Sequence, residues 1–94
     1  MLGLDQPYDL DADVALRPEP FGALAYHHGT RRLVFLKSAA LVATVHALRE
    51  TTSLGEALRR AEVPEAQWPG IVAAVTSLEE SGMVHPRTEV ARAV

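Results

Sequence analysis

A short apolar run, Leu-Val-Phe-Leu at positions 33–36, most constrains how this 94-residue chain can fold. Arg31 and Arg32 precede the run, Lys37 follows it, and no proline or glycine interrupts it, so the pattern predicts a β-strand over residues 31–37. Successive side chains of a strand point to opposite faces, so both faces of this strand need cover. Helices are expected on one face, and the sequence leaves the cover of the other face open.

Two further strands are expected before this one. Residues 14–17 form a short strand that stops at Pro18, and Pro20 follows; proline donates no ladder hydrogen bond, so this strand fits a sheet edge. Residues 22–27 alternate in character and lead into a turn in which Gly29 is free to take a positive φ. The strand over residues 31–37 then lies at the other edge, and a bare edge is a docking site for another extended chain.

Three helices are expected after the strands. The first begins with Ser38 as its N-cap, and the second begins with Ser53 and Glu56 in the spacing of a capping box. The third runs from about residue 68 and ends before Gly82, which suits the C′ position. This order predicts an α+β protein with a winged helix-turn-helix-like fold, a three-stranded antiparallel sheet followed by three helices.

The chain length and composition predict one domain. We expect the domain to span residues 14–86, with a flexible lead-in over 1–13 and a frayed tail over 87–94. No cysteine is present, which excludes disulfides and thiolate metal sites. No apolar run approaches the roughly 20 residues of a membrane helix, and the first residues do not read as a signal peptide, so a cytoplasmic location is expected.

The sequence offers little that could carry out catalysis. His27 and His28 are neighbours on a strand and point to opposite faces, which disfavours a shared metal ion. Glu79 and Glu80 lie at an exposed helix end, and no serine stands in a G-x-S-x-G turn. No catalytic residue, metal site or cofactor is therefore expected, and the chain is not expected to be an enzyme.

A small winged-helix DNA-binding regulator remains an alternative function. The formal net charge is −3, and residues 68–82 contain no Arg or Lys, whereas a helix that reads DNA normally presents such residues to the bases. Arg49, Arg59 and Arg60 lie on the other helices. Nucleic acid is therefore not the expected partner.

Residues 17–38, RPEPFGALAYHHGTRRLVFLKS, and residues 77–84, SLEESGMV, resemble the MftB family of peptide chaperones from mycofactocin biosynthesis. That family is similar to the PqqD family, and both are RiPP recognition elements. The resemblance covers about residues 14–86. It implies a non-catalytic winged fold that binds the leader of a ribosomally made precursor peptide and presents it to a radical-SAM maturase. Iron–sulfur clusters and S-adenosylmethionine would belong to that maturase.

The resemblance also implies where the leader binds, namely as an added strand on the strand over residues 31–37 and against the third helix. The candidate peptide-binding residues are Arg31, Arg32, Leu33, Val34, Phe35, Leu36, Lys37, Pro69, Val72, Ala73 and Thr76. An acidic leader would suit the basic flanks of the strand, and Val34→Pro is expected to remove an edge donor if that N–H points outward. Two alternatives stay open: a buried central strand at residues 33–36, and a homodimer through the same edge.

Overall fold

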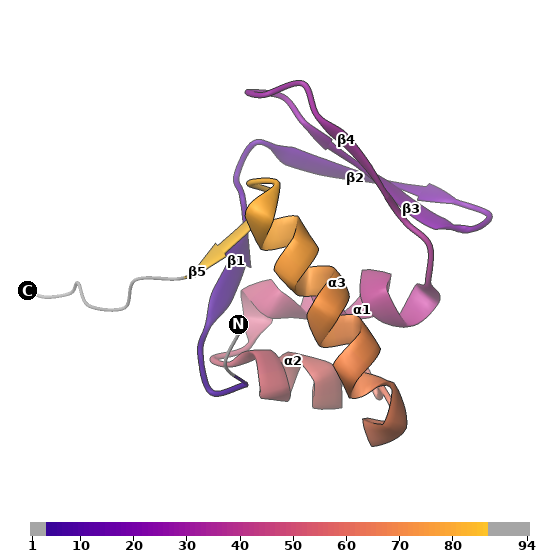
Figure 1. The fold of residues 1–94 in the computed structure, drawn as a ribbon, viewed down its shortest axis with the longest axis vertical. Helices are drawn as coiled ribbons and strands as arrows, with labels where there is room; N and C mark the ends of the chain where they lie inside the picture. The colour runs from indigo at the N-terminus through magenta and orange to yellow at the C-terminus, as the bar shows by residue number, and fades with distance from the viewer. Residues whose placement is uncertain (1–3, 87–94) are drawn as a thin grey trace, which may run out of the picture.

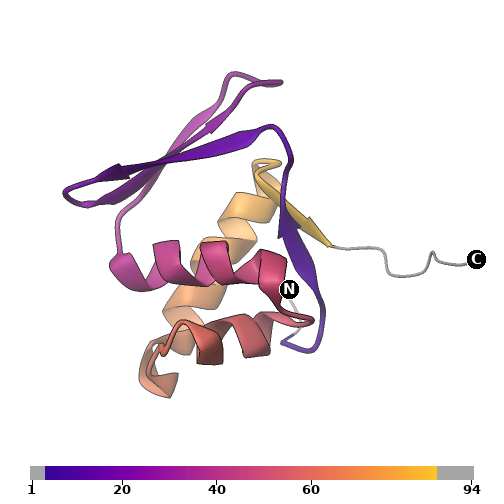
Figure 2. The same ribbon diagram turned by 180° about the vertical axis from the view of Figure 1, so that it is seen from behind.

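A three-stranded antiparallel sheet forms one layer of the molecule, and three helices lie on one side of it in the computed structural model, which describes residues 4–86 (Figures 1 and 2). The strands are β2 (Val14–Glu19), β3 (Gly22–His27) and β4 (Leu33–Leu36), in the spatial order β2-β3-β4. The predicted α+β class with its sheet and three helices is confirmed. β4 lies at a sheet edge, so the central-strand alternative is wrong.

The turn between β3 and β4 differs from the prediction. β4 begins at Leu33, because Arg31 lies in the turn with a φ of 64°. This residue, and not Gly29, takes the positive φ, and its N–H donates to the carbonyl of His27 at 2.7 Å. The strand predicted over residues 31–37 is therefore shorter at both ends.

Two of the three helices begin at serine residues whose side chains cap the first turn. The helices are α1 (Ala39–Ala47), α2 (Leu54–Arg60) and α3 (Trp68–Glu80), with 3₁₀ turns η1 (Leu48–Glu50) and η2 (Glu65–Gln67) before α2 and α3. Ser38 Oγ accepts from Leu41 N at 3.2 Å and Ser53 Oγ accepts from Glu56 N at 3.0 Å, which confirms both predicted N-caps. Glu56 reaches back to Thr52 rather than to Ser53, a variant of the capping box.

A second, two-stranded sheet joins the two ends of the described chain. β1 (Tyr8–Leu10) pairs antiparallel with β5 (Val84–Pro86), so the chain between residues 8 and 10 is not the flexible lead-in that we expected. Gly82, with a φ of 80°, ends α3 as predicted, and Met83 N donates to Leu78 O at 2.9 Å as the chain turns into β5. The predicted tail over residues 87–94 lies outside the described residues.

The core lies between the sheet and the helices and also includes β1 and β5. Its largest fully buried side chains come from β4, the helices and the segment after α3: Leu36, Val45, Leu48, Leu54, Leu58, Val75, Met83 and Val84. Within residues 4–86, no helix has the length and apolar character needed to cross a membrane.

Candidate functional site

The two faces of β4 have different surroundings. Leu36 is 1% exposed and Val34 packs against the core, so this face is covered by the helical layer. Leu33 and Phe35 are 55% and 59% exposed on the opposite face. The strand is apolar on both faces as predicted, but only one face is covered within the described chain.

The backbone of β4 also has one side paired and one side open. His27 N donates to Arg32 O at 3.0 Å, which makes these two residues a hydrogen-bonded pair of the antiparallel ladder. Such pairs recur at every second residue, so in the observed register Val34 opposite Ala25 directs its N–H and C=O to β3. Leu33 and Phe35 direct theirs to the open edge. The condition under which Val34→Pro would remove an edge donor, an outward N–H at Val34, is therefore not met.

Positive charge flanks the open edge. Arg31, Arg32 and Lys37 are exposed, and their side chains form no ion pair within residues 4–86. Arg31 and Arg32 precede the strand and Lys37 follows it, so an extended segment that paired with β4 would pass basic groups at both ends. This arrangement favours an acidic ligand over a basic one.

The candidate residues on α3 form a partly exposed flank of that helix. Pro69 and Ala73 are exposed, Val72 and Thr76 are half-buried, and Thr76 Oγ1 donates to Val72 O at 2.8 Å. The two views place β4 and α3 toward the same side of the molecule, with α1 on the other side (Figures 1 and 2). The main packing neighbours of β4 are β3 and α1. A shared groove between β4 and α3 therefore stays a prediction.

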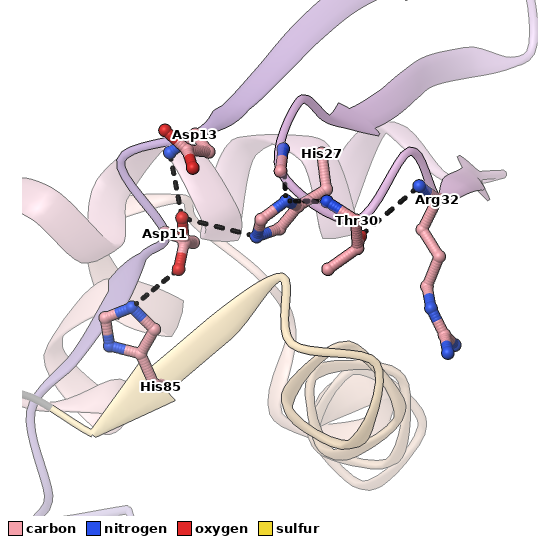
Figure 3. Close-up of polar contacts among 7 residues, drawn as sticks. Asp11, Asp13, His27, Thr30, Arg32 and His85 are labelled. Atoms are coloured by element: carbon pink, nitrogen blue, oxygen red, sulfur yellow. Dashed lines mark hydrogen bonds and ion pairs between the residues drawn. The ribbon is translucent and has the colours of Figure 1, made fainter.

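A polar cluster connects the turn of the β3–β4 hairpin to the segments beside it (Figure 3). His27 Nδ1 accepts from Gly29 N and Thr30 N, each at 3.1 Å, while its Nε2 lies 3.4 Å from Asp11 Oδ1. Asp11 Oδ2 lies 3.2 Å from His85 Nε2. The N–H of Asp13, which donates to Asp11, lowers the pKa of the Asp11 carboxyl, and His27 and His85 lower it further.

The hydrogen bonds of this cluster disfavour a metal ion between its side chains. Asp11, Asp13 and His27 each offer an atom within 4.8 Å of the others. Because His27 Nδ1 accepts two backbone N–H groups, a neutral His27 ring would carry its proton on Nε2, which lies 3.4 Å from Asp11 Oδ1. A metal ion on Nε2 would have to displace that proton. His28 points to the other face, where its ring packs edge-on against Tyr26 at 4.8 Å.

Sequence reasoning missed two features of this region. Asp11 was placed in the lead-in, although its spacing from Asp13 suits an Asx turn. Phe21 is not among the predicted site residues, yet its ring packs edge-on against Phe35 with centroids 5.6 Å apart. The available signal was an exposed aromatic residue in a turn between two predicted strands.

Comparison with known proteins shows which family this chain belongs to. The model of the peptide chaperone MftB family matches residues 7–85. The chain belongs to this family. The matched range begins before β1 and ends within β5, so the family match includes the second sheet as well as β4.

Individual MftB proteins are similar over most of the chain. The peptide chaperone MftB of Mycobacterium ulcerans (strain Agy99) is 41% identical over 83 residues, which are 88% of this chain and 76% of that protein. The corresponding protein of Mycobacterium tuberculosis (strain ATCC 25618 / H37Rv) gives the same values. That of Mycolicibacterium smegmatis (strain ATCC 700084 / mc(2)155) is 42% identical over 82 residues, 87% of this chain and 80% of the relative. No solved structure matches the chain significantly.

Proposed function

We propose that this protein is a non-catalytic peptide chaperone of mycofactocin biosynthesis, a PqqD-like RiPP recognition element. It binds the leader of the ribosomally made precursor peptide as a strand on β4 and presents it to a radical-SAM maturase. The observation that carries the proposal is the open edge of β4, where Leu33 and Phe35 direct backbone donors and acceptors to solvent between unpaired basic side chains. Membership of the peptide chaperone MftB family supports a peptide as the partner.

Strand addition suits this edge on physical grounds. Backbone hydrogen bonds to an open edge supply affinity for any extended peptide, and side-chain contacts on alternate positions supply selectivity. Arg31, Arg32 and Lys37 add electrostatic attraction for an acidic leader, which speeds association and weakens as salt rises. Maturation chemistry is assigned to the partner enzyme, in keeping with the absence of cysteine from this chain.

Calorimetric titration of the protein with the precursor leader tests the proposal. Leu33→Pro removes one outward N–H at the first residue of an edge strand, a position that tolerates proline, so the variant is expected to fold. Its affinity is expected to fall about tenfold relative to Leu33→Ala, which loses the same side chain but keeps the N–H. Val34→Pro is expected to destabilise the fold itself, because it breaks the β3–β4 ladder.

Two outcomes would contradict the proposal. A folded wild-type protein that shows no leader binding would exclude this function. Equal affinities for Leu33→Pro and Leu33→Ala would place the peptide elsewhere on the surface. The edge is also open to a second copy of the chain, so sedimentation with and without leader shows whether a dimer competes with the peptide.

A further inference from the structure

One face of the sheet points away from the helices (Figures 1 and 2). This face carries a group of apolar and aromatic side chains. We call this group the outer face; it comprises Phe21, Leu24, Tyr26, Leu33 and Phe35. Phe21 is 44% exposed, and its ring meets that of Phe35 at 82°, the edge-to-face geometry that aromatic pairs prefer. Nothing in residues 4–86 covers this face. An exposed apolar group with a polar rim is typical of an interaction surface.

The outer face ends in a shallow pocket beside the open edge. Phe21, Phe35 and Lys37 line this pocket. Lys37 follows Phe35 by two residues, so alternation along the chain directs its side chain to the same face. The pocket therefore offers aromatic surface next to an unpaired ammonium group, which suits an apolar side chain with a carboxylate close by.

Strand pairing connects this face to the β4 edge. Side chains of directly paired residues on neighbouring strands lie on the same face of a sheet. In a strand added to β4, the residues opposite Leu33, Phe35 and Lys37 would therefore point to the outer face, and the residues between them would point toward the helices.

We infer that the leader segment that pairs with β4 carries apolar side chains opposite Leu33 and Phe35 and a carboxylate opposite Lys37. These three residues are spaced two apart, and when the leader binds they extend the outer face by one strand, beside Leu33 and Phe35; this inference rests on the proposed function. The carboxylate comes first along an antiparallel leader and last along a parallel one. The specificity of the site is thus read partly on the outer face of the sheet, away from α3.

Charge at the β4 edge favours the leader over a second copy of the chain. If two copies paired antiparallel through β4, Arg31 and Arg32 of each would approach Lys37 of the other, and like charges placed opposite each other destabilise such a pair. A leader strand with a carboxylate opposite Lys37 would replace this repulsion with an attraction between opposite charges. Its apolar positions also continue the aromatic surface that Phe21 and Phe35 already form.

An alanine scan of the mycofactocin precursor leader, titrated into four forms of the full-length protein, tests the inference. The forms are wild type, Phe35→Ala, Lys37→Glu and Leu4→Ala, the last a control that truncates an exposed side chain away from the sheet. In wild type, affinity is expected to fall about tenfold at two apolar leader positions spaced two apart, and at an acidic position two residues before them in an antiparallel leader or two residues after them in a parallel one.

The protein variants locate these leader positions. In Phe35→Ala, truncating the apolar leader residue opposite position 35 is expected to lower the affinity little further, because the contact between the two side chains is already lost. Lys37→Glu is expected to bind the leader weakly, and a leader with Lys in place of its acidic residue is expected to restore binding. Leu4→Ala is expected to give the wild-type profile.

Three results would overturn the inference about the outer face without contradicting the proposed function. Leader binding that falls in Leu33→Pro but is unchanged in Phe35→Ala and Lys37→Glu would confine recognition to the backbone edge and the helix side. Loss of maturase binding alone in Phe35→Ala would assign the outer face to that enzyme. A dimer that Phe35→Ala dissociates and leader does not would assign it to a second copy. Absence of any leader binding to wild type would instead exclude the proposed function itself.

Discussion

At the scale of single residues, Asp11 is the point where three separate segments meet. Its carboxylate accepts from the backbone of Asp13 at 2.8 Å and lies beside the imidazoles of His27, from β3, and His85, from β5. His27 in turn organises the β3–β4 turn, because its Nδ1 accepts from Gly29 and Thr30. One carboxylate therefore links the hairpin that presents the open edge to the sheet that joins the chain ends.

Asp11 is expected to make folding stability depend on acid pH. Its pKa in the fold lies below the ordinary value of 3.8, so the unfolded chain binds the proton more readily. The carboxylate therefore contributes stability above about pH 4, and this contribution is lost as pH falls through the folded pKa. Asp11→Asn should destabilise the protein near pH 6, and its difference in unfolding free energy from wild type should shrink as pH falls below about 4, as measured by urea unfolding from pH 6 downward.

A matched control separates this effect from a general loss of charge. Asp5 is exposed, so Asp5→Asn removes one carboxylate without disturbing the contacts of His27 and His85. Its unfolding free energy should follow that of wild type at every pH. A constant difference between Asp11→Asn and wild type from pH 2.5 to 6 would show that Asp11 acts through packing rather than through its charge.

At the scale of elements, Gly22 sets how closely β4 approaches the start of β3. It has a φ of 147°, and a Cβ at this position would lie 2.1 Å from the carbonyl oxygen of Leu36. Gly22→Ala is therefore expected to destabilise the protein by roughly 1–3 kcal/mol or more and to displace β4, with weaker leader binding. Urea unfolding and calorimetry measure the two effects.

Gly70 provides the control for that substitution. It lies in the first turn of α3, and a Cβ there would meet nothing within 4 Å. Gly70→Ala is expected to be neutral or to stabilise the protein by up to about 1 kcal/mol, because alanine favours helix. Equal unfolding free energies for Gly22→Ala and Gly70→Ala would contradict the role assigned to the β3–β4 contact.

Elements with a local cause could be predicted from the sequence, and elements with a distant cause could not. Ser38, Ser53 and Gly82 act through neighbours a few residues away, so their roles follow from spacing alone. β1 and β5 have three residues each, too few for a pattern, and each exists because the other pairs with it across the sequence. The contact of Phe21 with Phe35 could not be predicted from the sequence for the same reason, since only the folded hairpins bring the two rings together.

At the scale of the whole molecule, β1 makes the N-terminal segment part of the core. Leu10 is 8% exposed and pairs opposite Val84 of β5, whereas Leu4 in the same segment is 42% exposed. Leu10→Ala is expected to lower the unfolding free energy by about 2–5 kcal/mol, and Leu4→Ala by about 0.5 kcal/mol or less. The larger loss is a substantial part of the roughly 5–15 kcal/mol typical of a whole domain, so the denaturant midpoint should fall sharply. Similar midpoints for the two variants would mean that the domain folds without β1.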